Sequence, residues 1–232
     1  MMYTYLILHI FTLLFPVSYS FESKVSFYKK WLPLFISIFS VAAFFIVWDV
    51  IFTSKGVWSF NRDYLIGLFF LQLPIEEWLF FITVPYSCVF IYEALNYYIK
   101  KDYLKKYAFV ITLVLVGIML SVAFLHINKL YTSVTLIFAS TFLLFHWFLF
   151  KDRYLGRFYM AYLVHLIPFF IVNGILTRLP VVIYNNAENL GIRLYTIPIE
   201  DTMYSLLLLL MNITFYEWLK GKFLKDKSDA KS

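Results

Sequence analysis

The sequence predicts an all-α integral membrane protein with seven transmembrane helices, arranged as two parallel three-helix repeats joined by a connector helix (3+1+3). Three observations lead to this prediction. The chain of 232 residues is 62% hydrophobic, and its mean hydropathy of +0.77 is far above the range of soluble proteins. It contains seven apolar stretches of membrane-spanning length, and its second half repeats the first at a constant offset.

Each apolar stretch is long enough to cross a bilayer as a helix, which takes about 17 to 25 residues. The first lacks the basic start of a secretory signal peptide and is followed by positive charge, so an anchored helix is predicted. The third is too long for one straight span, and Pro74 either kinks it or marks a short outer segment before the true span. The stretches lie near residues 3–20, 31–53, 66–98, 107–127, 130–150, 158–178 and 195–219.

Basic residues fall mainly on one side of the predicted membrane. Fifteen of the 20 Lys and Arg residues follow the first, third, fifth and seventh stretches. The positive-inside rule therefore places the N-terminus outside and the C-terminus in the cytoplasm, in what we expect to be a bacterial inner (cell) membrane. The lysine-rich tail after Lys220 is interpreted as a solvated end that sets this topology, with binding to anionic lipid head groups as a second interpretation. A single cysteine, Cys88, excludes a disulfide framework.

The internal repeat appears when the sequence is shifted by 124 residues, which places Pro74 on Pro198. The repeats then occupy residues 1–100 and 129–232, with the connector helix over 101–128. A single connecting span makes the two repeats parallel, and ligand sites in such folds lie between the repeats. The other matched pairs are Asp49 with Asn173, Thr53 with Thr177, Asn61 with Asn185, Gly67 with Gly191, Glu76 with Glu200, Glu77 with Asp201, Tyr92 with Tyr216 and Glu93 with Glu217.

Carboxyl groups at membrane depth are costly, so they need a partner or a function. Lys and Arg all lie at predicted span ends, and ion pairs deep in the bundle are therefore not expected. The Pro-Ile-Glu-Glu sequence at Pro74 can be a helix start, with proline first and acids facing the positive end of the helix dipole. Capping explains neither the repeat nor the apolar setting. We favour an acid pair beside Trp78, Phe80 and Phe81, where desolvation keeps one proton in place.

The other polar residues of the repeats have weaker interpretations. Glu93 and Glu217 lie about 25 Å along a helix from the motif acids. Pairing with interfacial lysines such as Lys100 and a functional role are equally open for them, and their change to Gln should reduce activity without abolishing it. The amides Asn61, Asn185, Asn173 and Asn212, with the hydroxyl of Thr177, are expected to bond between helices.

Composition and spacing exclude several functions. The seven glycines form no GxGxxG or P-loop motif, so we expect no flavin, nicotinamide or nucleotide cofactor. The four histidines are too scattered for a membrane di-iron centre, and no metal is expected. No lysine lies in mid-span of the last helix to bind retinal. Aromatic residues make up 22% of the chain; most are assigned to lipid-facing and interfacial positions, and the rest could line a tunnel and face a cation.

Several segments resemble the membrane-integral, heterodimer-type lycopene cyclases over nearly the full length. In some actinobacteria the c-type and d-type halves of this family are separate polypeptides, and in fungi they are fused to phytoene synthase. This chain resembles both halves fused together, with the c-type half over 1–100 and the d-type half over 129–232. The segments are LPIEEWLFF (73–81), FIYEALNYY (90–98), NGILTRLP (173–180), YNNAENLGIRLYTIPIED (184–201) and LLLLMNITFYEW (207–218).

The resemblance implies a lycopene beta-cyclase, an isomerase of the intramolecular lyase type without a cofactor. Such an enzyme converts the ψ ends of lycopene into β-ionone rings, giving γ-carotene and then β-carotene. A proton is delivered to C2, the C1 cation closes a ring, and a proton leaves C6. We assign the acid and base roles to Glu76 and Glu77 with Glu200 and Asp201, and supporting or substrate-binding roles to Asp49, Asn173, Glu93, Glu217, Asn61 and Asn185.

The expected partners are lycopene, other carotenoids and membrane lipid, with a homo-oligomer as an open possibility and no nucleic acid. The main alternative is a proton-coupled small-solute transporter, because parallel three-helix repeats with intramembrane acids also occur in carriers. A carrier would need polar residues along several spans, and this chain has few outside the two motif layers. A third alternative is a carotenoid-binding subunit without catalysis.

Overall fold

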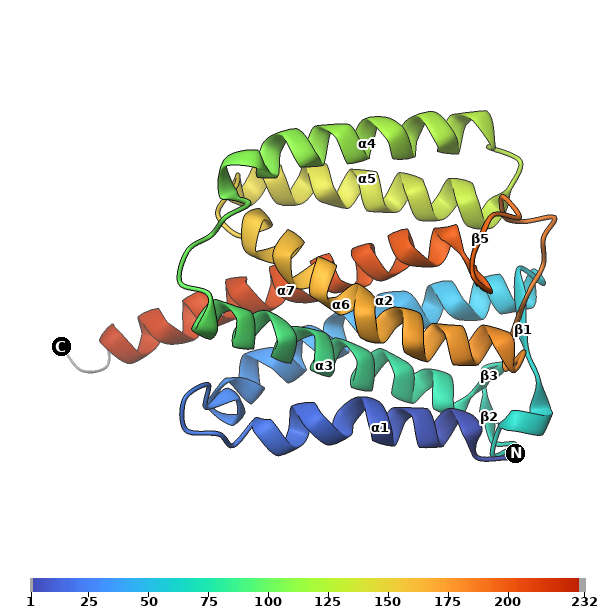
Figure 1. Cartoon of the computed structure of the whole chain (residues 1–232), viewed down its shortest axis with the longest axis horizontal. Coiled ribbons are helices and arrows are strands. Elements are labelled where there is room, and N and C mark those ends of the chain that lie inside the picture. Colours follow the sequence, from blue (N-terminus) through green and yellow to red (C-terminus); the bar gives the residue numbers. More distant parts are fainter. Residues whose placement is uncertain (1, 230–232) are drawn as a thin grey trace.

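The computed structural model describes residues 2–229, including the side chains of residues 2–223. It is an all-α bundle, as predicted, and seven helices run side by side along its length (Figure 1). The side chains of Lys225, Lys227 and Lys231, part of the basic tail, lie outside the described set. The helices are α1 (Thr4–Tyr19), α2 (Trp31–Ser54), α3 (Ile75–Tyr98), α4 (Ala108–Leu125), α5 (Leu130–Phe150), α6 (Leu155–Arg178) and α7 (Ile199–Asp229).

Within the part of the chain that the structure describes, five helical segments are apolar and long enough to cross a membrane. They contain α2, α3, α4, α5 and α6, and they identify the chain as a membrane protein. The predicted first span, α1, is also apolar but is shorter, at 16 residues. The predicted seventh span, 195–219, starts too early: residues 195–198 belong to the hairpin, and α7 begins at Ile199 and has 31 residues to Asp229.

The segment before Pro74 is a hairpin and not part of the helix, so Pro74 marks the end of a separate short segment and does not kink a span. Strands β2 (Phe69–Phe70) and β3 (Leu73–Pro74) pair antiparallel, and α3 begins at the next residue. Strands β5 (Arg193–Leu194) and β6 (Ile197–Pro198) do the same before α7. Gly67 and Gly191 enter these hairpins with φ of 90° and 74°, values that an L side chain rarely adopts.

The two halves are joined by a self-complementary strand pair, at the end of the bundle where the two hairpins lie. Strand β1 (Trp58–Phe60) pairs antiparallel with β4 (Val182–Tyr184), centred on Ser59 opposite Ile183. The amide of Asn61 donates to the carbonyl of Val181 at 2.9 Å, and the amide of Asn185 donates to Val57 at the same distance. These two bonds are related by the 124-residue offset in both partners. The contact is therefore locally twofold, like an interface between two equal subunits.

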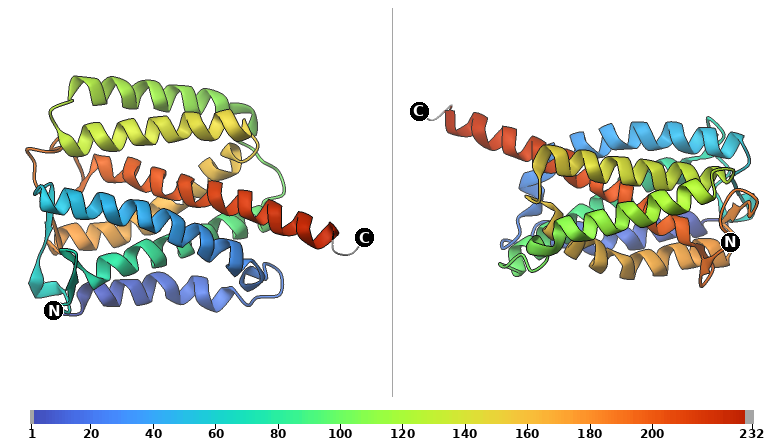
Figure 2. Two further views of the ribbon diagram at one scale, coloured as in Figure 1. Left: turned by 180° about the vertical axis from the view of Figure 1, so that it is seen from behind. Right: turned by 90° about the horizontal axis from the view of Figure 1, so that it is seen from above.

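The central helices are α2, α3, α6 and α7. Helices α3 and α7 begin next to their hairpins, and α2 and α6 both pack against them. Helix α1 packs on α3 at one edge, whereas α5 packs on α7 at the other edge and carries α4 outside it (Figure 2). The run Leu206–Leu210 in α7 is almost fully buried, with each residue no more than 2% exposed. The interior of the bundle thus lies between the two repeats.

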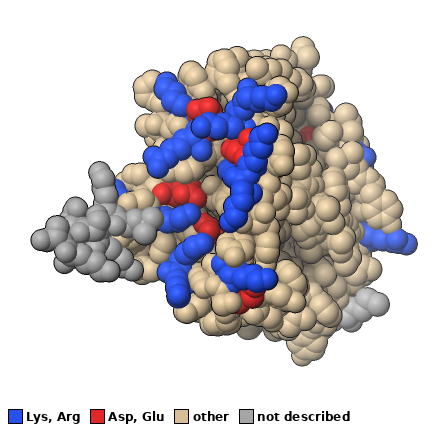
Figure 3. Space-filling view, turned by 60° about the vertical axis from the view of Figure 1, so that its left-hand side comes forward, with Lys and Arg blue, Asp and Glu red and all other residues tan. Residues whose placement is uncertain are grey.

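The two ends of the bundle differ in charge. The N-terminus and the hairpins lie at one end, whereas the α1–α2, α3–α4 and α5–α6 connections lie at the other with the start of the basic tail (Figure 1). Lys and Arg side chains gather at this second end (Figure 3). We call the two ends the hairpin end and the basic end.

Candidate active site

A cavity of about 100 Å³ lies between the central helices. On α3 it is lined from Glu77 to Ile91, which spans about 21 Å at 1.5 Å per residue. Helices α6 and α7 form the facing wall. At the hairpin end it is lined by Trp58, Phe60 and Tyr184 of the β1–β4 pair. The cavity is therefore long, mostly apolar and placed between the repeats, a suitable site for the end of an extended apolar molecule.

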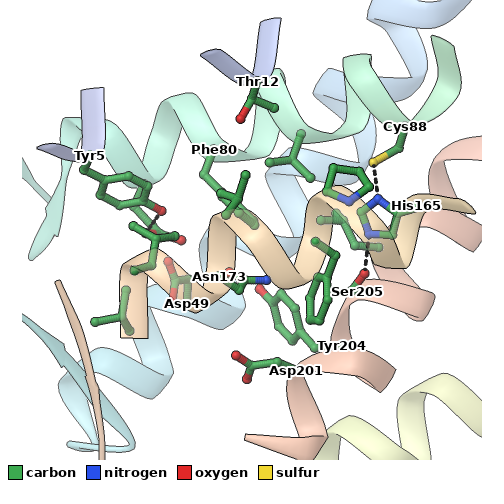
Figure 4. Close-up of a pocket in the computed structure, with 18 of the residues that line it drawn as sticks. Tyr5, Thr12, Asp49, Phe80, Cys88, His165, Asn173, Asp201, Tyr204 and Ser205 are labelled. Carbon is green, nitrogen blue, oxygen red and sulfur yellow. Dashed lines mark hydrogen bonds between the residues drawn. The ribbon is translucent and has the colours of Figure 1, made fainter. Parts of the chain in front are cut away.

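Three carboxyl groups face this cavity near its hairpin end: Asp49 from α2, Glu77 from α3 and Asp201 from α7. Asn173 of α6, the repeat equivalent of Asp49, lies with them (Figure 4). All three acids are buried, with exposures of 2%, 8% and 6%. The repeat-related pairs Asp49/Asn173 and Glu77/Asp201 thus meet in one site. The first pair combines an acid with an amide, and the second combines two acids.

Tyrosine hydroxyls hold two of the three acids. Tyr5 donates to Oε2 of Glu77 at 2.7 Å. Tyr131 donates to Oδ1 of Asp201 at 2.5 Å, and Tyr184 donates to Oδ2 at 2.8 Å. Burial and the neighbouring Asp201 raise the pKa of Tyr184 far above its ordinary value, so this phenol stays protonated. Asp201 therefore has a donor on each oxygen, an arrangement that favours the carboxylate form.

Asp49 has a different environment. Its Oδ2 is buried and makes no hydrogen bond to the described residues. None of the ion pairs among the described residues involves Asp49. The indole of Trp58 interacts with this carboxyl group, but the oxygen that is buried without a donor leaves its desolvation only partly compensated, which favours the neutral form. Asp49 is thus the cavity acid best suited to carry a proton.

Glu76 and Glu200, the first acids of the two motifs, do not line the cavity. They are 0% and 1% exposed and bond to the hairpin loops. Oε1 of Glu76 accepts the amide of Ile66 at 2.7 Å, and Oε1 of Glu200 accepts the amide of Leu190 at the same distance. Thr132 also donates to Glu200, at 2.6 Å. These acids hold the loops that lead into α3 and α7, which is close to the helix-start interpretation.

Aromatic rings surround Asp49, Glu77 and Asp201, which we call the acid layer. Tyr204 lines the cavity and makes edge contacts with Phe45 at 5.1 Å and Trp48 at 5.6 Å between ring centroids. Trp58 contacts Tyr131 at 5.2 Å. A cation formed beside these rings would be stabilised by their faces and kept from water.

Further along the cavity, Cys88, His165 and Ser205 form a hydrogen-bonded row (Figure 4). His165 contacts the Cys88 sulfur through Nδ1 at 3.1 Å and the Ser205 hydroxyl through Nε2 at 2.9 Å. This row satisfies its own polar atoms, so it can border an apolar ligand at little cost. Among the described residues, no group of three or more His, Cys, Asp or Glu side chains could hold a metal ion.

Glu93 and Glu217 lie outside the cavity, near the basic end. Glu93 pairs with Lys30, pairs with Lys220 at 2.7 Å and accepts the hydroxyl of Tyr216 at 2.7 Å. Glu217 pairs with Lys220 at 3.0 Å. The predicted pairing of these acids with lysines is thus confirmed, but the partners are Lys30 and Lys220 and not Lys100.

The two loop asparagines also lie outside the cavity. Oδ1 of Asn61 accepts the amide of Asp63, and Oδ1 of Asn185 accepts the amide of Ala187, at 3.1 and 3.0 Å. They shape equivalent turns beside the β1–β4 pair and do not contact the acids. Of the predicted supporting residues, the structure brings Asp49 and Asn173 to the site.

The tyrosines that hold the acids were not identified from the sequence. Tyr5 and Tyr131 make equivalent bonds in the two halves, but they differ by 126 residues and not 124. A fixed-offset comparison aligns Tyr5 with Lys129 and misses the relation. The count of 19 tyrosines does not indicate which of them bond to the acids.

Comparison with known proteins supports the family resemblance. Comparisons with curated proteins and with solved structures gave no match. A family model described as lycopene cyclase matches residues 2–95 and 128–219, which are most of the chain and fall one in each repeat. The chain therefore belongs to the lycopene cyclase family.

Proposed function

We propose that this protein is a lycopene beta-cyclase that forms β-ionone rings at the ψ ends of lycopene, giving γ-carotene and then β-carotene. Membership of the lycopene cyclase family supports a carotenoid-cyclising enzyme. The observation that carries the proposal is the acid layer of Asp49, Glu77 and Asp201 at one end of a long apolar cavity. An apolar polyene has its reactive group at its tip, so such a cavity brings that group to the acids.

The reaction requires one proton in and one proton out. In our assignment Asp49 is neutral and transfers its proton to C2 of the terminal alkene, which leaves a cation at C1. The C5=C6 double bond attacks C1, a C1–C6 bond forms and the positive charge moves to C5. Glu77 removes the proton at C6 and the C5=C6 double bond forms again, so the product is an isomer of the substrate.

The site also has to be reset and the cation protected. Transfer of the proton from Glu77 back to Asp49 restores both groups, and no electron or external proton is consumed. We assign Asp201, held by two phenols, as a carboxylate that stabilises the cation. Glu76 and Glu200 are positioning residues in this assignment, because they bond to the loops and not to the cavity.

We also propose that all seven helices cross the membrane as two parallel repeats, α1–α3 and α5–α7, with α4 as connector. The domain limits remain 1–100, 101–128 and 129–232. The equivalent hairpins before α3 and α7 support this proposal. The gathering of basic side chains at one end supports a cytoplasmic C-terminus and an outer hairpin end.

Pigment analysis of a lycopene-accumulating bacterial host that expresses this chain alone tests the function. We expect γ-carotene and β-carotene, separated by liquid chromatography, together with loss of lycopene. The control is Asp49→Asn, which keeps the size of the side chain but removes the transferable proton. Unchanged lycopene in membranes that contain the folded wild-type protein would contradict the proposal, and Glu77-dependent solute uptake into proteoliposomes would favour a carrier.

A further inference from the structure

One side of the cavity wall reaches the surface of the bundle, about halfway along helix α6. Pro168 lines the cavity and is exposed, although it lies in the middle of α6. Val172, one turn further, also lines the cavity and is half-buried, as is Thr12 on α1. Surrounding side chains on this face are apolar and exposed, such as Ile167 at 65% and Ile171 at 60%. The opening therefore faces lipid and not water.

At the hairpin end no lining residue is as exposed as Pro168, since Trp58 is buried and Phe60, Val182 and Tyr184 are half-buried. Trp58 and Phe60 of β1 and Val182 and Tyr184 of β4 line the cavity there. The strands that carry them are joined by backbone pairing. A route through this end would require separation of the two halves.

The repeat shows that the opening is particular to one half. At the 124-residue offset Phe44 and Trp48 of α2 correspond to Pro168 and Val172 of α6. On α5, Phe138 corresponds to Thr12 of α1 by the 126-residue offset that relates Tyr131 to Tyr5. Phe138 contacts Phe44 at 5.7 Å and Trp48 at 5.2 Å between ring centroids. Three aromatic rings thus occupy the position of three smaller side chains in the other half; Trp48 is buried, and Phe44 and Phe138 cover it from outside, at 36% and 44% exposed.

We propose that the gap between α1 and α6, bordered by Thr12, Pro168 and Val172, is a lateral portal through which the end of a linear carotenoid enters the cavity from the bilayer. The identity of the ligand rests on the proposed function, whereas the portal itself rests on the cavity. A carotenoid that enters this way stays in an apolar medium from the membrane to the acid layer. At the hairpin end the paired strands β1 and β4 cover the cavity and limit the access of water to the cation.

Val172→Trp tests the portal, because it places in α6 the residue that fills the equivalent position in α2. Ile171→Trp is the matched control, since Ile171 is the neighbouring residue and does not line the cavity. The readout is labelling of Cys88, the single thiol of the chain, which lies in the cavity wall. Proteoliposomes are treated with the lipid-soluble N-phenylmaleimide or with a charged, water-soluble maleimide, and the adduct is measured by intact mass.

We expect N-phenylmaleimide to label the wild type and Ile171→Trp at similar rates. Labelling of Val172→Trp should be about tenfold slower or more, because a close-packed gap admits the reagent only after rearrangement. Equal rates in both tryptophan variants, faster labelling by the charged reagent, or no labelling of the wild type would overturn the portal. If Val172→Trp does not fold, Thr12→Phe closes the gap from the α1 side and carries the same expectation.

Lycopene conversion, measured on the same samples, separates the two proposals. Slower labelling of Val172→Trp without any conversion by the wild type would support the portal and contradict the cyclase function. Conversion by the wild type with unchanged labelling of Val172→Trp would support the function and contradict the portal.

Discussion

The hydroxyl of Tyr131 donates to Oδ1 of Asp201 at 2.5 Å, across the interface between α5 and α7. The second oxygen of Asp201 accepts the hydroxyl of Tyr184, so two phenols fix one carboxylate at the end of an apolar cavity. A carboxylate with a donor on each oxygen is held in position, and both donors favour its ionised form. This arrangement gives Asp201 a role different from that of Asp49, which has no donor at its buried oxygen.

Loss of either phenol hydroxyl should weaken the hold on Asp201. A hydrogen bond to a charged group contributes about 1.5 to 3 kcal/mol, which corresponds to about 10-fold to 100-fold in rate if the cation depends on it. We expect Tyr131→Phe and Tyr184→Phe each to lower the rate of lycopene conversion within this range. Tyr159→Phe is the control, because Tyr159 bonds to Thr112 and does not line the cavity. Equal losses in all three variants would point to general destabilisation.

Adjacent acids of the first motif should differ in their response to glutamine. Glu77→Gln removes a cavity carboxylate, and we expect a loss of about 10² to 10⁴ in rate because a general base is removed. Glu76→Gln keeps an oxygen that can accept the amide of Ile66, so most of the activity should remain. Initial rates per folded molecule in membranes measure both effects. A Glu76→Gln variant as inactive as Glu77→Gln would return Glu76 to a catalytic role.

Helix geometry, applied to the sequence alone, already indicates that the two adjacent motif acids have different surroundings. Successive residues of an α-helix point about 100° apart, so Glu76 and Glu77 cannot both face a narrow cavity. The sequence could not say which one does, because both neighbours of the motif are apolar. That choice depends on where α2 and α7 pack against α3, a matter of tertiary structure.

The helices and the repeat were predictable because hydrophobic length and a constant offset are local signals. The hairpins before α3 and α7 were missed because a short apolar run does not distinguish strand from helix. Leu71, Gln72 and Tyr195 have φ values of 50°, 68° and 64°, which their residue types do not announce. The tyrosine partners were missed because α1 and α5 follow a different offset from the rest of the repeat.

The Asp49/Asn173 pair tests whether the position of the acid matters. Asp49→Asn should lower the rate by about 10² or more, because it removes the group that we assign as the proton donor. In the double variant Asp49→Asn with Asn173→Asp, the acid moves to the equivalent position in the other repeat. We expect partial recovery, since both positions border the same cavity. A double variant no more active than Asp49→Asn would show that the acid has to lie at the α2 position.

The ion pairs at the basic end should stabilise the bundle and leave the chemistry unchanged. Glu93→Gln leaves two lysines, Lys30 and Lys220, without their shared carboxylate. A fully buried pair broken in this way costs about 3 to 5 kcal/mol, and we expect about 1 to 3 kcal/mol here because these lysines are 31% and 26% exposed. Thermal unfolding in detergent should occur at lower temperature, whereas the rate per folded molecule stays near that of the wild type. Glu22→Gln, which affects a surface contact with Tyr98, is the control. A fall in the rate per folded molecule without a change in stability would instead place Glu93 in the proton chemistry of the cavity.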